Sequence, residues 1–373
     1  MNFQKLDWKT MMSRYENVEY DISKYHEILC PIDDRPDFLK RYISLPVMQR
    51  LGGVGLLCGT DWTALYKNRI YYSRLDHSIG VALIIWHFTH NKVQTLAGLF
   101  HDIATPVFSH VSDFRKGDAL TQSITEEPTS LIIRNSPSLM ELLRQDGILV
   151  ESIEDYHIYP IADNEIPRLS ADRLEYMFPS GMALDGSWKM EEIKLCYDNI
   201  VILQNEDGKD ELGFKSLEIA EFYCEHFCSI GHILQLNENK LALHLLGQVM
   251  NLAVKEGLLA EEDFMTKSEK EIISIMDSME DFSYESCEQK KLFSLYKTFR
   301  NMTEVLHTTK PMDIDKYFCV NLKVKQRYIN PLVQSKNSFE LPKRLSQVSE
   351  KSKKIIEDFL SYEDTPYGCV KLF

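Results

Sequence analysis

The sequence has no long apolar run, no excess of basic residues and no dense cysteine framework. Of its 373 residues 44% are hydrophobic, yet no stretch approaches the roughly 20 apolar residues that cross a bilayer. The first residues, 1–9, are polar and unlike a secretory signal. The eight cysteines are widely scattered, which predicts reduced thiols. We therefore expect a cytoplasmic protein with no membrane partner.

The scarcity of positive charge argues against one class of partner. The formal net charge is −14, whereas duplex nucleic acid is bound chiefly through Lys and Arg contacts to phosphates, so no duplex partner is expected. A small anionic substrate is compatible with an acidic chain, because a metal ion and a few arginines can meet its phosphates locally.

Internal repeats, low-complexity tracts and long linkers are also missing, so the domain boundaries are soft. The chain is long enough for one large or two closely joined domains. The best break lies near 231–238, between two long helical patterns. We expect a helical core over residues 1–235 and a C-terminal helical lobe with short strands over 236–373.

Hydrophobic periodicity predicts a mostly α protein. Apolar residues recur at spacings of three and four over five segments, namely 78–90, 93–103, 216–234, 240–256 and 268–279. Partial alternation of β-forming residues over 316–324, with a second short pattern over 367–373, predicts a small β-sheet in the C-terminal lobe.

His101 and Asp102 place two metal-binding side chains on consecutive positions. Adjacent helical residues point about 100° apart, so both reach one ion only if other elements close the site. Ligands of suitable type occur at His77 and Asp172, each within a helix-like pattern. Two imidazoles and two carboxylates favour a divalent transition metal ion (Mn, Fe, Ni, Co or Zn), with Mg possible, and leave positions open for water and substrate.

The order His, His-Asp, Asp resembles that of the HD-domain phosphohydrolases. Arg-Leu-Asp-His-Ser-Ile-Gly-Val precedes the pair and Phe-Ser-His-Val-Ser-Asp follows it. Within the superfamily the chain most resembles the deoxynucleoside triphosphate triphosphohydrolase branch, most strongly over residues 45–176. The resemblance implies an HD-domain helical bundle that uses metal-activated water to cleave a phosphate ester or anhydride of a nucleotide or nucleotide-like substrate. It also implies a homo-oligomer.

The resemblance assigns roles to further residues. Asp102 matches the family's ligand beside the attacking water. His110 and Asp113 match the histidine and aspartate that act near the reacting phosphate, and Arg74 matches a phosphate contact. Two more positions are carried over as substrate contacts, Tyr176 and Gln49.

The chain departs from the family at other positions, which argues against an ordinary deoxynucleoside triphosphate. Thr105 replaces a histidine, and the region of the family's His-Glu pair contains Glu126 and Glu127, either of which would then serve as the acid or base. At two sugar-contact positions the chain has Leu56 and Pro179-Ser180. Lost hydrogen bonds to a sugar hydroxyl change specificity strongly.

Other interpretations remain open. His110 is also compatible with a structural histidine, Arg74 with a salt bridge, and Tyr176 with packing behind Asp172. At the level of function, the alternatives are a catalytically altered HD-fold protein that binds a nucleotide for regulation, and a nuclease of single strands.

Overall fold

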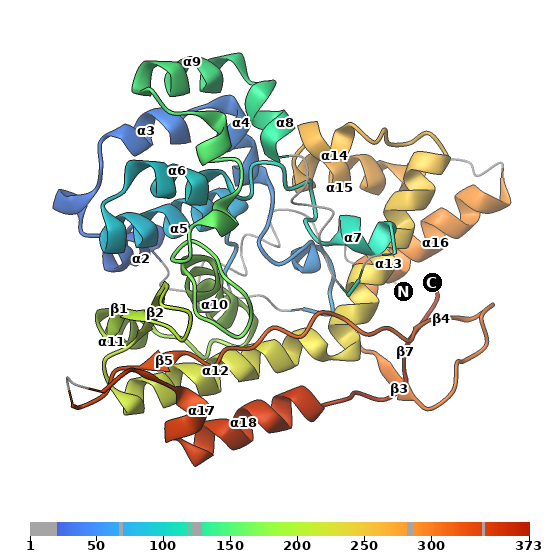
Figure 1. The fold of residues 1–373 in the computed structure, drawn as a ribbon. Helices are drawn as coiled ribbons and strands as arrows, with labels where there is room; N and C mark the ends of the chain where they lie inside the picture. Colours follow the sequence, from blue (N-terminus) through green and yellow to red (C-terminus); the bar gives the residue numbers. More distant parts are fainter. Residues whose placement is uncertain (1–20, 67–69, 118, 121–128, 282–285, 338–339) are drawn as a thin grey trace.

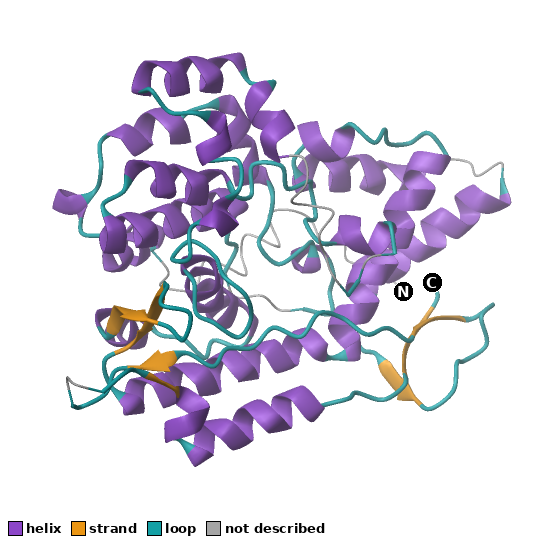
Figure 2. Ribbon diagram, viewed as in Figure 1, coloured by secondary structure: helices purple, strands orange, loops and turns teal. Residues whose placement is uncertain are grey.

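The structure, a computed structural model, describes residues 21–66, 70–117, 119–120, 129–281, 286–337 and 340–373. Helices dominate, and the few strands lie in two separate groups, at the left and at the right of the view (Figures 1 and 2). The expected mostly α fold with small sheets is confirmed. Among the described residues, no helix is both long enough and apolar enough to cross a membrane.

The first half of the chain forms a group of helices around α5 (Arg74–Thr89). Its other members are α2 (Ile22–Leu29), α3 (Phe38–Ile43), α4 (Pro46–Gln49), α6 (Lys92–Phe100), α8 (Thr129–Arg134), α9 (Pro137–Asp146), α10 (Ala171–Leu184) and α11 (Met190–Asp198). Helix α7 (Val111–Arg115) instead packs against a helix of the second half, Asn237–Lys255. Short 3-10 turns connect them at Ile32–Asp34, Arg50–Gly53, Thr60–Trp62, Val150–Ser152 and Tyr156–Ile158.

Local capping explains where α5 and α6 begin and end. Ser73 and Asp76 form a capping box at the start of α5. His90 takes a left-handed conformation at its end, and Asn91 then caps α6. The tight connection makes α5 and α6 pack side by side (Figure 1). Sequence periodicity placed both helices correctly, although α6 ends before His101.

Two long helices, α12 (Leu217–Gln235) and α13 (Asn237–Lys255), meet at a corner at Leu236. They agree with the expected patterns over 216–234 and 240–256. The other helices in the described part of the chain are α14 (Asp263–Thr266), α15 (Glu269–Asp277), the 3-10 turn Ser278–Asp281, α16 (Cys287–Asn301), α17 (Leu345–Val348) and α18 (Glu350–Ser361). Helix α18 packs along α12, and α16 packs against α13 (Figure 1).

The described strands form two small sheets. One has the order β1 (Ile200–Gln204), β2 (Asp210–Phe214), β5 (Leu332–Val333), β6 (Lys343–Arg344), with β2 and β5 parallel. The other has the order β3 (Leu306–Thr308), β7 (Tyr367–Lys371), β4 (Tyr317–Val320), and its neighbours are antiparallel. Strands β4 and β7 fall where alternation predicted them, whereas the β1–β2 hairpin was not expected.

One disulfide corrects the expectation that all thiols are reduced. Cys319 and Cys369 are bonded across β4 and β7. They are direct partners in the antiparallel register, with their Cα atoms 4.1 Å apart. A pairing between residues 50 positions apart follows from strand register, which sequence spacing alone does not reveal. The other six cysteines are free.

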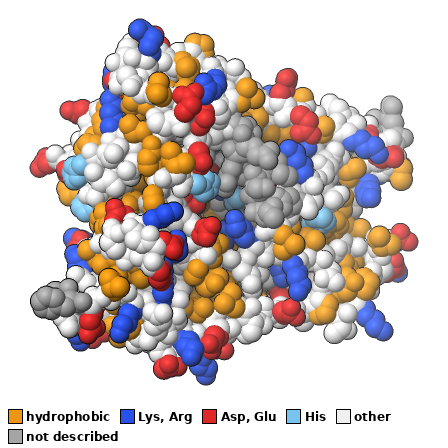
Figure 3. Space-filling model, viewed as in Figure 1, with side chains coloured by type: hydrophobic (Ala, Val, Ile, Leu, Met, Phe, Trp, Pro, Cys, Tyr) orange, Lys and Arg blue, Asp and Glu red, His pale blue; other side chains and the backbone are white. Residues whose placement is uncertain are grey.

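The buried apolar side chains form two clusters. The first core lies among α2, α5, α6, α10 and α12, and the second lies around α13, α15 and α16. The division of the chain at residue 235 remains a prediction, and each core contains residues from both sides of it. On the face seen in Figure 3, acidic and basic side chains are interspersed.

Candidate metal centre

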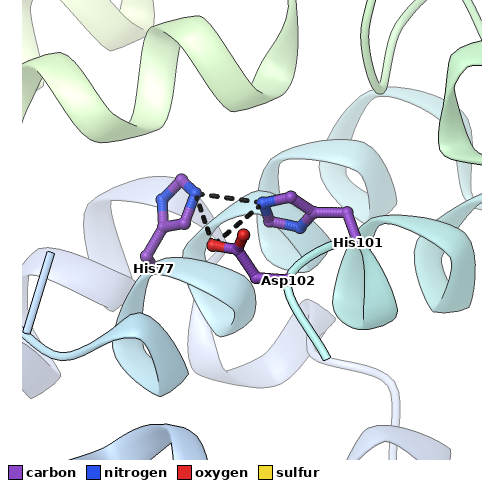
Figure 4. Close-up of side chains that lie close together, drawn as sticks. All are labelled: His77, His101 and Asp102. Atoms are coloured by element: carbon purple, nitrogen blue, oxygen red, sulfur yellow. Dashed lines mark hydrogen bonds and ion pairs between the residues drawn. The ribbon is translucent and has the colours of Figure 1, made fainter. Parts of the chain in front are cut away.

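Three of the expected ligands converge at the start of α5 and the end of α6. His77 lies in the first turn of α5, His101 follows the last residue of α6, and Asp102 is next in the chain. The Nε2 atoms of the two histidines are 3.1 Å apart. Asp102 Oδ2 lies 3.4 Å from His101 Nε2 and 3.7 Å from His77 Nε2. Figure 4 shows the three side chains pointing toward one another.

Asp172 joins this cluster from α10. Ser170 caps the helix, so Asp172 is in its first turn. Its Oδ1 lies 3.1 Å from His77 Nε2 and 3.7 Å from His101 Nε2. Two ligands of one ion at about 2.1 Å are about 3.0 Å apart at right angles and about 3.4 Å apart at tetrahedral angles. The donor atoms of His77, His101 and Asp102 lie within 4.8 Å of one another and fit a single divalent ion, and Asp172, which lies outside that group but near both histidines, is the candidate fourth ligand.

The second nitrogen of each imidazole is already engaged. His101 Nδ1 lies 2.7 Å from the carbonyl oxygen of Gly98, which can only accept, so Nδ1 donates. His77 Nδ1 donates to the carboxylate of Glu175. Both Nε2 atoms are thus directed into the cluster, and such bonds behind a ligand fix its tautomer and orientation.

Charge in this cluster is balanced by close partners. Burial would lower the pKa of His77, but the carboxylates of Glu175 and Asp172 outweigh it and raise that pKa to about 10. Burial would raise the pKa of Asp172, yet the bond from His77 holds it at about 2. A metal ion would displace the proton from His77 Nε2, so binding releases protons.

Arg74 and Thr105 hold Asp102 from two sides. Arg74 Nη1 donates to Asp102 Oδ2 at 2.7 Å, and its Nε donates to Ser109 Oγ at 3.0 Å. Thr105 Oγ1 donates to Asp102 Oδ1 at 2.7 Å. Burial would raise the pKa of Asp102, but Arg74 and the two histidines keep it well below its usual range. Arg74 therefore forms a buried ion pair and also lines the cavity described below.

His110 and Asp113 form a pair beside the cluster. His110 precedes α7, and its Nδ1 lies 3.0 Å from Asp113 Oδ2. Asp113 is fully buried, whereas His110 reaches the cavity. Burial lowers the pKa of His110 although the bond to Asp113 opposes this, so the imidazole is neutral at pH 7.

The remaining predicted residues differ in whether they reach the cavity. Tyr176 lines the cavity, and burial raises its pKa to about 12. Gln49 is exposed, outside the cavity lining, and donates to the carbonyl oxygen of Ile43 at 2.8 Å. Glu126 and Glu127 lie outside the described residues.

The cluster opens into a cavity of about 250 Å³. Its lining contains Arg74, His110, Tyr176 and all four candidate ligands. It also includes residues that the sequence reasoning missed, chief among them Tyr156, Arg173, Lys325 and Arg327. The ring of Tyr156 lies 5.0 Å from that of His101.

Lys325 and Arg327 come from an extended segment between β4 and β5. Basic residues at every second position, beginning with Lys323, are the sequence signal that could have placed two cations on one face. The side chain of the intervening Gln326 donates to the carbonyl oxygen of Leu360 on α18. The charge of Arg327 acts on both His110 and Tyr176.

A buried glutamate from α15 fixes the loops on another side of the cavity. Glu269 accepts hydrogen bonds from Gly55 N at 2.9 Å and Trp62 Nε1 at 2.7 Å, and it is also bonded to the backbone of Phe108. Phe108 and the next residue, Ser109, have positive φ angles, an uncommon conformation for non-glycine residues. Glu269 thus supports the loop that carries Ser109 and His110.

Comparisons with known proteins agree with this fold. No protein-family model matches the chain. The uncharacterized protein YdhJ of Bacillus subtilis is 22% identical over 86% of this chain and 90% of its own length. The metal-dependent phosphohydrolase cns2 of Cordyceps militaris is 26% identical over 39% of this chain and 40% of its own length.

Two solved structures resemble the whole molecule. A phosphohydrolase of Bacteroides thetaiotaomicron, 15% identical, superimposes with a TM-score of 0.57 over 90% of this chain and 96% of that protein. A hypothetical protein of Aquifex aeolicus, 14% identical, gives a TM-score of 0.59 over 91% of this chain and 93% of that protein. At these identities the likeness shows a shared fold.

Proposed function

We propose that this protein is a metal-dependent phosphohydrolase of the HD type that cleaves a phosphate ester or anhydride of a nucleotide or nucleotide-like substrate. The observation that carries the proposal is the convergence of His77, His101, Asp102 and Asp172, with both Nδ1 atoms engaged behind the ligands. A divalent ion held there lowers the pKa of water and neutralises charge on a phosphoryl oxygen.

The chain's own residues then surround the reacting group. Arg74, fixed by Asp102 and Ser109, presents its guanidinium at the cavity, and Arg327 adds a second cation from the C-terminal segment. Planar guanidinium groups suit phosphate oxygens. His110, oriented by Asp113, is placed to exchange a proton with the leaving group.

The cavity size and two names support this assignment. Ligand cavities commonly measure about 300 to 1,000 Å³, so a volume near 250 Å³ favours a single small molecule over a nucleic-acid strand. One relative is named a metal-dependent phosphohydrolase, and one protein of the same fold is named a phosphohydrolase.

The test combines elemental analysis with a phosphate-release screen. The chelated protein is reloaded with Mn, Fe, Co, Ni, Zn or Mg and assayed on nucleoside mono-, di- and triphosphates. We expect about one ion per chain and release with at least one metal. His101→Ala should abolish metal binding and phosphate release. His90 is an exposed histidine outside the cluster, so His90→Ala should change neither quantity. Activity that survives chelation and the loss of His101 would refute the proposal.

A regulatory, nucleotide-binding function is the second candidate. The observation that favours it is Thr105, which replaces a family histidine and donates to a candidate ligand instead of presenting an imidazole. Metal and nucleotide binding without turnover under any metal would support this candidate over the hydrolase.

A further inference from the structure

The cavity lies between the two cores, and the walls differ in chemistry. The metal cluster is carried by helices of the first core, whereas Leu243 and Val324 belong to the second core and Tyr66 packs against it. Asn239, in the first turn of α13, lines this same wall. Next to the cations of Lys325 and Arg327, this wall presents the apolar side chains of Leu243 and Val324 together with a phenol hydroxyl and a carboxamide.

The hydroxyl of Tyr66 is buried and makes no hydrogen bond with any residue that the structure describes. Leaving such a group unpaired is costly, so an unpaired hydroxyl in a cavity wall calls for an explanation. A bound ligand that supplies a partner would explain both its burial and its position at the cavity.

The carboxamide of Asn239 has a defined orientation. Its Nδ2 donates to the carbonyl oxygen of Leu234 at 3.0 Å. That bond assigns the amide, so Oδ1 is the atom that remains as an acceptor, and within the described part of the chain it accepts no hydrogen bond. Tyr66 lines the same cavity as Asn239.

This combination restricts the ligand group. A sugar would leave several hydroxyls against the apolar side chains of Leu243 and Val324, and an alkyl chain would leave the Tyr66 hydroxyl and the Asn239 carbonyl unpaired. A heteroaromatic ring has apolar faces and an edge that carries both donors and acceptors. Such a ring can contact the apolar side chains with its faces and pair with the Tyr66 hydroxyl and the Asn239 carbonyl at its edge.

We propose that the wall formed by Tyr66, Asn239, Leu243 and Val324 is the base-binding subsite of a nucleoside phosphate. The Tyr66 hydroxyl and Asn239 Oδ1 hydrogen-bond the edge of the base, and the apolar side chains contact its faces. This inference rests on the proposed phosphohydrolase function and assigns the part of the cavity that holds the base of its nucleotide substrate.

The kinetic test uses Tyr66→Phe, which removes one oxygen atom. The metal-loaded wild type and variant are compared on their best nucleotide and on p-nitrophenyl phosphate, which has no base. We expect KM for the nucleotide to rise about 3- to 10-fold, as for one lost hydrogen bond, while kcat/KM for p-nitrophenyl phosphate stays within twofold. Equal effects on both substrates, or none on either, would overturn the inference.

A matched control separates recognition from stability. Tyr197→Phe removes a buried tyrosine hydroxyl that donates to the carbonyl oxygen of Leu29 at 2.7 Å, away from the cavity lining. It should leave the ratio of the two substrates' kcat/KM values unchanged. A similar shift of that ratio in this variant would assign the effect of Tyr66→Phe to general destabilisation.

The affinity for nucleotides tests the base subsite even if the protein hydrolyses no substrate. Calorimetry compares nucleoside monophosphates with inorganic phosphate on the metal-loaded protein. We expect the nucleotides to bind more tightly than phosphate, and Tyr66→Phe to reduce that advantage about 3- to 10-fold. Nucleotides that bind no more tightly than phosphate would refute the base subsite, whereas missing turnover alone would refute only the hydrolase.

Discussion

Glu175 accepts the Nδ1 hydrogen of His77 at a point where the carboxylate has no exposed surface. Its Oε1 receives the hydroxyl hydrogens of Tyr72 at 2.6 Å and Tyr25 at 3.1 Å. Gly80, one turn after His77, leaves the room that this carboxylate occupies, because a Cβ there would contact the Glu175 side chain. A buried carboxylate is therefore built in behind a candidate metal ligand.

Glu175→Gln should weaken metal binding about 10- to 100-fold, the usual cost of losing a partner behind a ligating histidine. The amide cannot compensate the charge on His77, although its size is unchanged. Metal titration of the chelated protein, followed by competition with a chromophoric chelator, gives the affinity. An unchanged affinity would contradict a role for Glu175 in supporting the ligand.

Two further variants test whether the loss of affinity is specific to Glu175. Gly80→Ala displaces Glu175 without removing it, so it should weaken metal binding in the same direction. Glu141→Gln changes an exposed carboxylate that pairs with Arg144 on α9, and it should leave the affinity unchanged.

His110→Ala should lower kcat about 10²- to 10⁴-fold while the metal content stays normal, because His110 reaches the cavity but lies outside the cluster of ligands. Metal analysis and steady-state kinetics on the same preparation measure both quantities. Full hydrolysis at normal metal content would make His110 a structural residue, as its bond to Asp113 also allows.

The sequence was most informative where local periodicity and residue type determine structure. Helices α5, α12 and α13 could be located because their apolar faces repeat at helical spacing. His101 and Asp102 were recognisable because two metal-binding side chains on consecutive helical positions are unusual, although the helix ends before them. The direct spatial proximity of His77 and Asp172 came from motif order, not from periodicity.

Features that depend on distant packing were not predictable. Glu175 resembles any helical glutamate in the sequence, and only the crossing of α10 with α5 places it under His77. Lys325 and Arg327 enter the cavity because the segment after β4 passes along α12. The Cys319–Cys369 bond likewise follows from the register of β4 and β7.

Glu269 should make stability depend on pH near neutrality. Burial raises its pKa from 4.5 to about 7, although the bond from Trp62 opposes the shift. Between these values the folded protein binds more protons than the unfolded chain, so the free energy of unfolding falls as pH rises. Relative to Glu269→Gln, the wild type should lose about 2 to 3 kcal/mol between pH 5 and 8.

Denaturant unfolding at a series of pH values measures that difference. Glu271→Gln is the matched control on the same helix, because Glu271 is exposed and its pKa is lowered by bonds to Ser268. Its unfolding free energy relative to the wild type should be constant over this range. A constant difference for Glu269→Gln as well would show that the buried carboxyl does not titrate there.

Arg327 should contribute to substrate binding through a position that α12 sets. The carbonyl oxygen of Arg327 lies where a Cβ on Gly231 would be only 2.9 Å away, and Gln235 Nε2 donates to the carbonyl oxygen of Lys325 at 3.0 Å. Arg327→Ala should raise KM for a phosphate substrate about 10- to 100-fold, as expected for a charge-assisted bond. Gly231→Ala should push the segment outward and raise KM by a smaller factor, with the guanidinium still present.

Steady-state kinetics at normal metal content tests both variants. If Arg327→Ala raises KM while Gly231→Ala leaves it unchanged, the segment is not positioned by α12. If neither variant changes KM, Arg327 does not contact the substrate.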